Sequence, residues 1–161
     1  SSGSSRVVHP EITLHFDDSI THIEKWKPNK PISAVYFSNN KGKYFLKRFL
    51  IENQSKEDFF IEKEDKLIHV DLNWRPILIL NFEKIRGKEA FPAFEINVEE
   101  FISVKGYKAQ GNQLTSKKIK KVELKEVLPY VDSNEKSINE IEVLNEEHIS
   151  SDNESQIKMD I

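Results

Sequence analysis

PISAVYFSNNKGKYFLKRFL, residues 31–50, is the stretch that decides the fold class. Two runs rich in aromatic and β-branched residues, Ile32–Ser38 and Tyr44–Glu52, flank Asn39-Asn40-Lys41-Gly42. Asn and Gly tolerate the positive φ angles that tight turns require, so this stretch predicts a β-hairpin.

The same kind of short run recurs outward from the hairpin, separated by turn residues, which is typical of an all-β domain. A short helical turn is expected near Glu99-Glu100 or Ser116–Lys118. The further predicted strands are Ile12–Phe16, Phe59–Glu62, Leu67–Leu72, Ile77–Phe82, Phe94–Asn97, Phe101–Lys105 and Ile119–Leu124.

The composition divides the chain of 161 residues into three parts. Residues 1–5 are interpreted as a remnant of cloning outside the fold, and residues 6–131 as the folded body. Residues 132–161 are rich in Ser, Asn and Glu and lack aromatic residues, which predicts a disordered tail, with a short helix at Ile138–Leu144 as the alternative. The tail holds nine acids against two lysines, a net charge of −7, so the total of −3 leaves +4 for the body.

Several classes of function find no support in the residues. Without cysteine the chain has no disulfide, thiolate metal site or thiol nucleophile. The five histidines lack metal-site spacing, no nucleophile elbow or phosphate-binding glycine loop occurs, and Asp17-Asp18 is better explained as a turn than as a cation site. No apolar run is long enough to cross a membrane, so a soluble, cytoplasmic protein without membrane contact is expected.

The strongest functional signal is the lysine ribbon FISVKGYKAQGNQLTSKKIKKVELK, residues 101–125. Gly106 and Gly111 bracket a loop that is expected to bend back and offer backbone amides and lysines to an anion. The predicted DNA-binding residues of the ribbon are Lys105, Lys108, Lys117, Lys118, Lys120 and Lys121. On charge alone, a solvated edge strand that resists aggregation explains these lysines equally well.

The hairpin carries a second basic group, which adds Lys41, Lys43, Lys47 and Arg48 to the predicted DNA contacts. These cations are expected at the hairpin tip and at outward positions of the returning strand. The neighbouring aromatic residues are interpreted as packing residues more readily than as stacking platforms for bases.

Three separated segments resemble, in order and spacing, the C-terminal domain of the A-type subunit of bacterial DNA topoisomerase IV. They are HFDDSITHIEKWKPNKPISAVYF, KGKYFLKRFLIEN and EEFISVKGYKAQGNQLTSKKIKKVEL, within about residues 9 to 130. The resemblance implies a β-pinwheel, a propeller-like disc whose basic rim binds and bends duplex DNA, with about two blades here. It places ATP and magnesium on other domains, with no cofactor in this piece, and implies a bacterial, nucleoid-associated location.

The resemblance also limits the function. Residues 105–111 match the place of the DNA-wrapping box of the related DNA gyrase, yet they lack its arginine pair and double glycine, which argues against tight wrapping and negative supercoiling. No tyrosine follows an arginine, as the family's breakage–reunion tyrosine does, so this piece is expected to bind DNA without cutting it.

The partners implied are double-stranded DNA and, through the parent protein, the B-type subunit of topoisomerase IV in a heterotetramer, with the piece itself monomeric. The acidic tail is expected either to compete with DNA for the basic rim or to act only as a solubilising segment. The rival function is a non-enzymatic protein-interaction module anchored by Trp26 and Phe59-Phe60.

Overall fold

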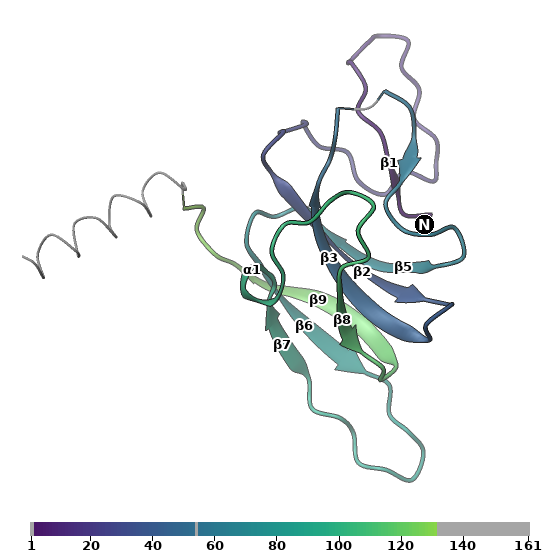
Figure 1. Ribbon diagram of the computed structural model, residues 1–161, viewed down its shortest axis with the longest axis vertical. Helices are drawn as coiled ribbons and strands as arrows, with labels where there is room; N and C mark the ends of the chain where they lie inside the picture. Colours follow the sequence, from purple (N-terminus) through teal and green to yellow (C-terminus); the bar gives the residue numbers. More distant parts are fainter. Residues whose placement is uncertain (1, 54, 132–161) are drawn as a thin grey trace, which may run out of the picture. The chain divides into compact units, whose positions relative to one another are not determined.

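The structure, a computed structural model, describes residues 2–53 and 55–131 (Figure 1). The chain divides into a unit of residues 1–128 and a unit of residues 129–161, and the tail predicted for residues 132–161 lies outside the described residues. The elements are β1 (Ser4–Ser5), β2 (Pro31–Ser38), β3 (Lys43–Leu50), β4 (Asp58–Phe59), β5 (Lys66–Asp71), β6 (Pro76–Phe82), β7 (Phe94–Asn97), α1 (Val98–Phe101), β8 (Asn112–Thr115) and β9 (Ile119–Val127).

The strands form antiparallel sheets, which confirms the all-β prediction. A four-stranded sheet has the order β5-β2-β3-β8, a three-stranded sheet has the order β7-β6-β9, and β1 pairs with β4. The predicted hairpin is present: β2 and β3 pair from Pro31↔Leu50 to Ser38↔Lys43. Gly42 closes its turn with φ 63°, and the Gly42 amide donates to the Ser38 carbonyl at 2.8 Å.

The main hydrophobic core lies between the two larger sheets. Because side chains alternate along a strand, Val35 and Leu46 share one face of the β2–β3 hairpin. They pack with Leu78 and Leu80 of β6, and Ile102 after α1 enters the same cluster. All five side chains are at most 2% exposed, so this cluster excludes water and joins the two sheets.

The opposite face of the four-stranded sheet is covered as well. Tyr36 and Phe49 point to this side, where Phe60, Ile61 and Tyr107 from two loops pack over them. The four-stranded sheet therefore has no fully solvated face. Every residue of β3 between its two terminal positions is buried as a result.

The first residues of the chain belong to the fold. β1 pairs with β4 through Ser4↔Phe59 and Ser5↔Asp58, and the Phe60 amide donates to the Gly3 carbonyl at 2.9 Å. Residues 3–5, which were expected to lie outside the fold, therefore contribute backbone contacts to it, while their interpretation as a remnant of cloning stays a prediction. They attach through backbone groups and serine hydroxyls, such as that of Ser4, which donates to Glu57 Oε1 at 2.6 Å. Neither kind of contact leaves an apolar signal in a Ser-rich sequence.

Two predicted strands are wrong and two short strands were missed. Ile12–Phe16 forms a turn instead, in which the Leu14 amide donates to the Glu11 carbonyl at 3.0 Å. Phe101–Lys105, also predicted as a strand, has only an isolated bridge from Lys105 to Phe49. Its first residue, Phe101, is the last residue of α1, which agrees with the helical turn expected near Glu99-Glu100. β1 and β8 were not predicted.

Gly111 holds the loop after Tyr107 against β3, and its replacement tests this packing. Its φ is 87°, and a Cβ there would collide with the Leu46 carbonyl. Gly111→Ala is expected to reduce the free energy of unfolding by about 2 kcal/mol or more, because it combines a strained backbone with a backbone clash. Thermal unfolding followed by circular dichroism measures the change.

Gly106→Ala is the matched control, because a Cβ at Gly106 meets nothing within 4 Å. Its melting temperature is expected to stay close to that of the unchanged chain. Equal melting temperatures for the two variants would contradict the close approach of Gly111 to β3.

Candidate nucleic-acid interface

The fold brings the hairpin tip and part of the lysine ribbon together. β8 pairs with β3 through Tyr44↔Thr115, Phe45↔Gln113 and Leu46↔Asn112, so the segment before β8 returns to the hairpin. Three lysines each donate to a side-chain amide oxygen in or just before β8: Lys41 Nζ to Gln110 Oε1 at 2.6 Å, Lys43 Nζ to Gln113 Oε1 at 3.2 Å, and Lys105 Nζ to Asn112 Oδ1 at 2.8 Å.

These three residues, which we call the amide-held lysines, form no ion pair with a carboxylate within the part of the chain that the structure describes. A neutral amide orients an ammonium group without cancelling its charge, whereas a carboxylate cancels it. Lys41 and Lys105 are exposed and Lys43 is half-buried. A phosphate group approaching this edge would therefore meet oriented and uncompensated cations.

Lys117 and Lys118 form a second group of cations, which contacts the loop between β6 and β7. The Lys117 ammonium lies 4.1 Å from the Phe91 ring centroid, and the Lys118 carbonyl accepts a hydrogen bond from the Glu83 amide at 2.9 Å. This loop adds three exposed cations that were not among the predicted residues. They belong to the sequence Lys-Ile-Arg-Gly-Lys at 84–88, in which the alternating cations and the glycine are the signal that could have found them.

Four ribbon lysines instead form ion pairs with carboxylates. Their hydrogen bonds to the carboxylates lower the pKa of Asp58 and Glu123 and raise the pKa of Lys118 and Lys125. The pairs are Lys108–Asp58 at 2.5 Å, Lys118–Glu83 at 2.8 Å, Lys121–Glu123 at 2.7 Å and Lys125–Glu95 at 2.6 Å. Lys120 is exposed and has no such partner within the part of the chain that the structure describes.

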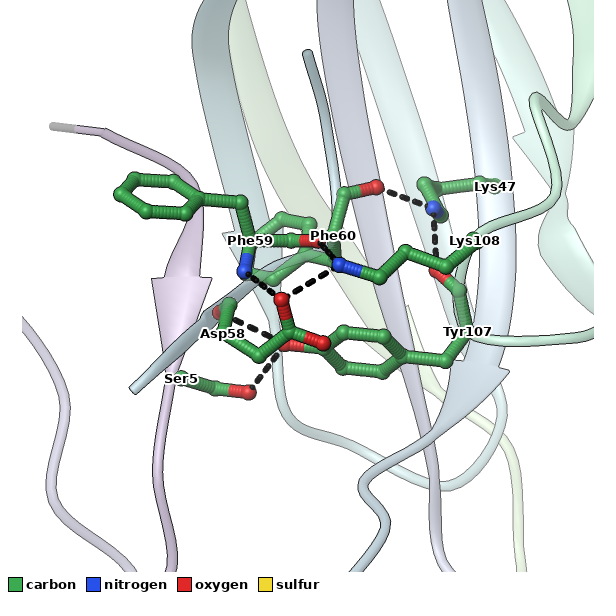
Figure 2. Close-up of polar contacts among 7 residues, drawn as sticks. All are labelled: Ser5, Lys47, Asp58, Phe59, Phe60, Tyr107 and Lys108. Atoms are coloured by element: carbon green, nitrogen blue, oxygen red, sulfur yellow. Dashed lines mark hydrogen bonds and ion pairs between the residues drawn. The ribbon is translucent and has the colours of Figure 1, made fainter. Parts of the chain in front are cut away.

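Lys47 does not face solvent, and its predicted role as a DNA contact is wrong. Its side chain is 2% exposed, and the ammonium lies 4.8 Å from the Phe49 ring centroid. Figure 2 shows Lys47 Nζ donating to two backbone carbonyls, those of Phe60 and Tyr107. Lys47 therefore holds the two covering loops on the sheet.

Arg48 is also buried, on the other face of β3, and the prediction for it is wrong for the same reason. It is 7% exposed, and its Nη2 donates to the Trp74 carbonyl at 3.0 Å. Burial lowers the pKa of its guanidinium, and the nearby Glu99 carboxylate opposes that effect. Both cations lie inside because the four-stranded sheet is covered on both sides.

The loop at residues 106–111 is anchored to the protein rather than open to an anion. The Ala109 amide donates to the Gly106 carbonyl at 2.9 Å, and Tyr107 enters the second core cluster. The Tyr107 hydroxyl bonds to the Asp58 carbonyl and to Ser5 Oγ, each at 2.8 Å, while Lys108 contacts Asp58 and Phe59 (Figure 2). The loop therefore supplies the structural support for its neighbours.

Other site types can be assessed for residues 2–53 and 55–131. Asp17 forms a turn in which its Oδ1 accepts from the Ser19 amide at 2.9 Å, as expected from the sequence. No group of three or more His, Asp or Glu side chains able to hold a metal ion occurs among these residues. None of the helices in this range is long and apolar enough to cross a membrane.

An all-β domain with clustered cations on a sheet edge and on loops belongs to the class of domains suited to a phosphate backbone. A family model described as the topoisomerase C-terminal domain of Bacteroidota matches residues 1–126, and the chain belongs to this family. No curated protein and no solved structure matches the chain. Membership makes the chain a topoisomerase C-terminal domain and makes DNA its expected partner.

The buried Lys47 leads to a pH-dependent stability. Burial lowers its pKa from 10.5 to about 8, and the charge of Lys108 adds to this effect. Between pH 8 and 10.5 the unfolded chain therefore binds more protons at this residue than the folded chain does, so the Lys47 contribution to stability rises with pH.

Lys47→Met removes this titration and leaves the Phe60 and Tyr107 carbonyls without their donor. The stability advantage of the unchanged chain over Lys47→Met is expected to grow by on the order of 1–2 kcal/mol between about pH 8 and 9.5. Urea unfolding at each pH measures the difference. An advantage that is constant over this range would contradict a depressed pKa at Lys47.

Proposed function

We propose that this domain is the non-catalytic DNA-binding part of a bacterial type IIA topoisomerase, the A-type subunit of topoisomerase IV, and that it holds and bends duplex DNA for strand passage. The observation that carries the proposal is the group of amide-held lysines, Lys41, Lys43 and Lys105. Their ammonium groups are held by amide side chains in or just before the edge strand β8, and within residues 2–53 and 55–131 they form no ion pair with a carboxylate. Membership of a topoisomerase C-terminal family supports DNA as the polyanion.

Contacts of this kind hold the phosphate backbone and carry little sequence information. The domain therefore contributes affinity and geometry, while strand cleavage takes place elsewhere in the parent enzyme. In this proposal ATP and magnesium act on other domains, and the B-type subunit of topoisomerase IV joins the parent in a heterotetramer. A cytoplasmic, nucleoid-associated location follows from the same role.

The two larger sheets are proposed to be blades of a β-pinwheel. Each is antiparallel, and they share a core, as neighbouring blades do. The place that matches the wrapping box is an anchored loop centred on the buried Tyr107. This favours capture and bending of DNA over tight wrapping.

A protein-interaction module is the second candidate, and the exposed apolar residues of the N-terminal segment favour it. Ile12, Phe16, Ile23 and Trp26 are 106%, 45%, 66% and 37% exposed. The anchors expected from the sequence fit less well, because Phe60 is buried and Trp26 Nε1 already donates to the Ile51 carbonyl at 2.9 Å. Loss of DNA binding when the amide-held lysines are replaced would separate the two candidates.

Salt dependence tests the proposal. If the three amide-held lysines, Lys117 and Lys120 contact phosphates, log K should fall against log salt with a slope of roughly −4.5. Replacing Lys41, Lys43 and Lys105 together by Ala should bring this slope closer to zero by roughly 3 and weaken binding at least about tenfold. Fluorescence anisotropy with a labelled duplex of mixed sequence measures both quantities.

The matched control replaces Lys108, Lys121 and Lys125, which form ion pairs, by Ala and changes the net charge equally. This variant should change the slope by less than about 1, because each lost lysine charge was already compensated by a carboxylate. Equal losses in the two triple variants would contradict the amide-held lysines as the principal contact. A salt-independent affinity of the unchanged chain would contradict DNA-backbone binding altogether.

The acidic tail provides a separate test. Residues 132–161 carry a net charge of −7, and we propose that they compete with DNA for the basic surface. Deleting them should tighten DNA binding at low salt, with the effect fading as salt screens the charges. Unchanged affinity would assign the tail a solubilising role instead.

A further inference from the structure

The loop between β6 and β7 projects beyond the ends of its strands (Figure 1). Its tip is a tight turn in which the Lys88 amide donates to the Ile85 carbonyl at 3.1 Å. Gly87 occupies the third position of the turn with φ 80°. A positive φ at this position is typical of a type II turn and favours glycine. The tip therefore has a defined conformation.

Charge is concentrated around this tip. The segments 83–91 and 116–120 contain six cations and two acids, and one of the acids, Glu83, forms an ion pair with Lys118. Lys84, Arg86 and Lys88 are all exposed. The excess of positive charge makes a polyanion the natural partner of this loop.

Ile85 lies in the middle of these cations with 46% of its surface exposed. Single exposed apolar residues are common on proteins and need no explanation by themselves. Here, however, the apolar side chain stands at the end of a projecting turn and between Lys84 and Arg86. Cations that flank an apolar side chain are the combination that minor-groove-binding proteins use, in which the cations enter the groove and the apolar residue separates two base steps.

The stem of the loop is stiffened by aromatic contacts. The Phe82 and Phe91 rings pack edge to face, with centroids 6.2 Å apart. The Lys117 ammonium lies 4.1 Å from the Phe91 centroid and 5.8 Å from the Phe82 centroid, which ties the loop before β9 to this stem. A stiff stem reduces the entropy lost when the tip binds.

We propose that this tip inserts into the minor groove of duplex DNA, with Arg86 in the groove and Ile85 as a wedge between two base pairs. The inference rests on the proposed function and deepens it, because it assigns the bending of DNA to one loop. The amide-held lysines then supply affinity, and the wedge supplies the kink. A·T-rich DNA is the preferred partner, since its narrow minor groove attracts arginine most strongly.

The test uses the full chain, its Ile85→Ser variant and a control, Ile23→Ser. Ile23 is 66% exposed and lies in the N-terminal segment, so the control makes the same chemical change away from the tip. The DNA is an A·T-rich duplex of about 30 base pairs with fluorophores at both ends and one 2-aminopurine in the centre. Anisotropy measures affinity, energy transfer measures bending, and 2-aminopurine fluorescence measures unstacking.

The unchanged chain and Ile23→Ser should increase both energy transfer and 2-aminopurine fluorescence on binding. Ile85→Ser should bind within about threefold of the unchanged chain but lose most of both signals, because the wedge contributes mainly to the kink and only modestly to affinity. Netropsin, which occupies the minor groove, should weaken binding of the unchanged chain by about tenfold or more, whereas methyl green in the major groove should not.

Equal bending by Ile85→Ser and the unchanged chain, or insensitivity of binding to netropsin, would overturn the inference and leave the proposed function standing. No binding of the duplex by the unchanged chain would instead overturn the proposed function. A basic and apolar tip also suits an anionic membrane. Co-sedimentation with phosphatidylglycerol vesicles that Ile85→Ser abolishes, together with unaltered DNA bending, would assign the tip to that partner and overturn the inference.

Discussion

The burial of the four-stranded sheet on both faces is the constraint on which the rest of the structure depends. One face packs against the three-stranded sheet, and the other is covered by loops. The covering loops pack over β3, which carries Lys47 among its buried residues. Lys47 holds these loops by donating to the Phe60 and Tyr107 carbonyls, which would otherwise be buried without a donor.

This arrangement links residues that are far apart in the chain. Tyr107 is held at its backbone by Lys47 and at its hydroxyl by the Asp58 carbonyl and Ser5. Ser5 and Asp58 are also paired residues of β1 and β4, so the Tyr107 hydroxyl bridges these two strands. The lowered pKa of Lys47 reflects the cost of burying an ammonium group, and its hydrogen bonds to the Phe60 and Tyr107 carbonyls offset this cost.

The remaining cations differ in whether a carboxylate neutralises them, and this difference determines which of them the proposed interface uses. Carboxylates compensate Lys108, Lys121 and Lys125, whereas amide side chains hold Lys41 and Lys105, which pair with no carboxylate among the described residues. A phosphate gains more from the second kind of cation, because no existing ion pair has to be broken. The basic loop between β6 and β7 adds a projecting contact of a different shape. Together these features suit a domain that holds DNA and changes its path.

The all-β class, the 39–42 turn and most of the longer strands could be predicted from the sequence, because side-chain alternation and turn chemistry are local properties. The sequence also located the ribbon that contains Lys105, and the family match supports the assignment of the chain to a topoisomerase domain. Which cations reach solvent depends instead on contacts between residues that are distant in the chain. Alternation cannot show that both faces of a sheet are covered, so Lys47 and Arg48 looked like surface residues. Nor can charge spacing reveal whether a carboxylate or an amide from another strand lies beside a lysine, because those partners are distant in sequence and meet only when the chain folds.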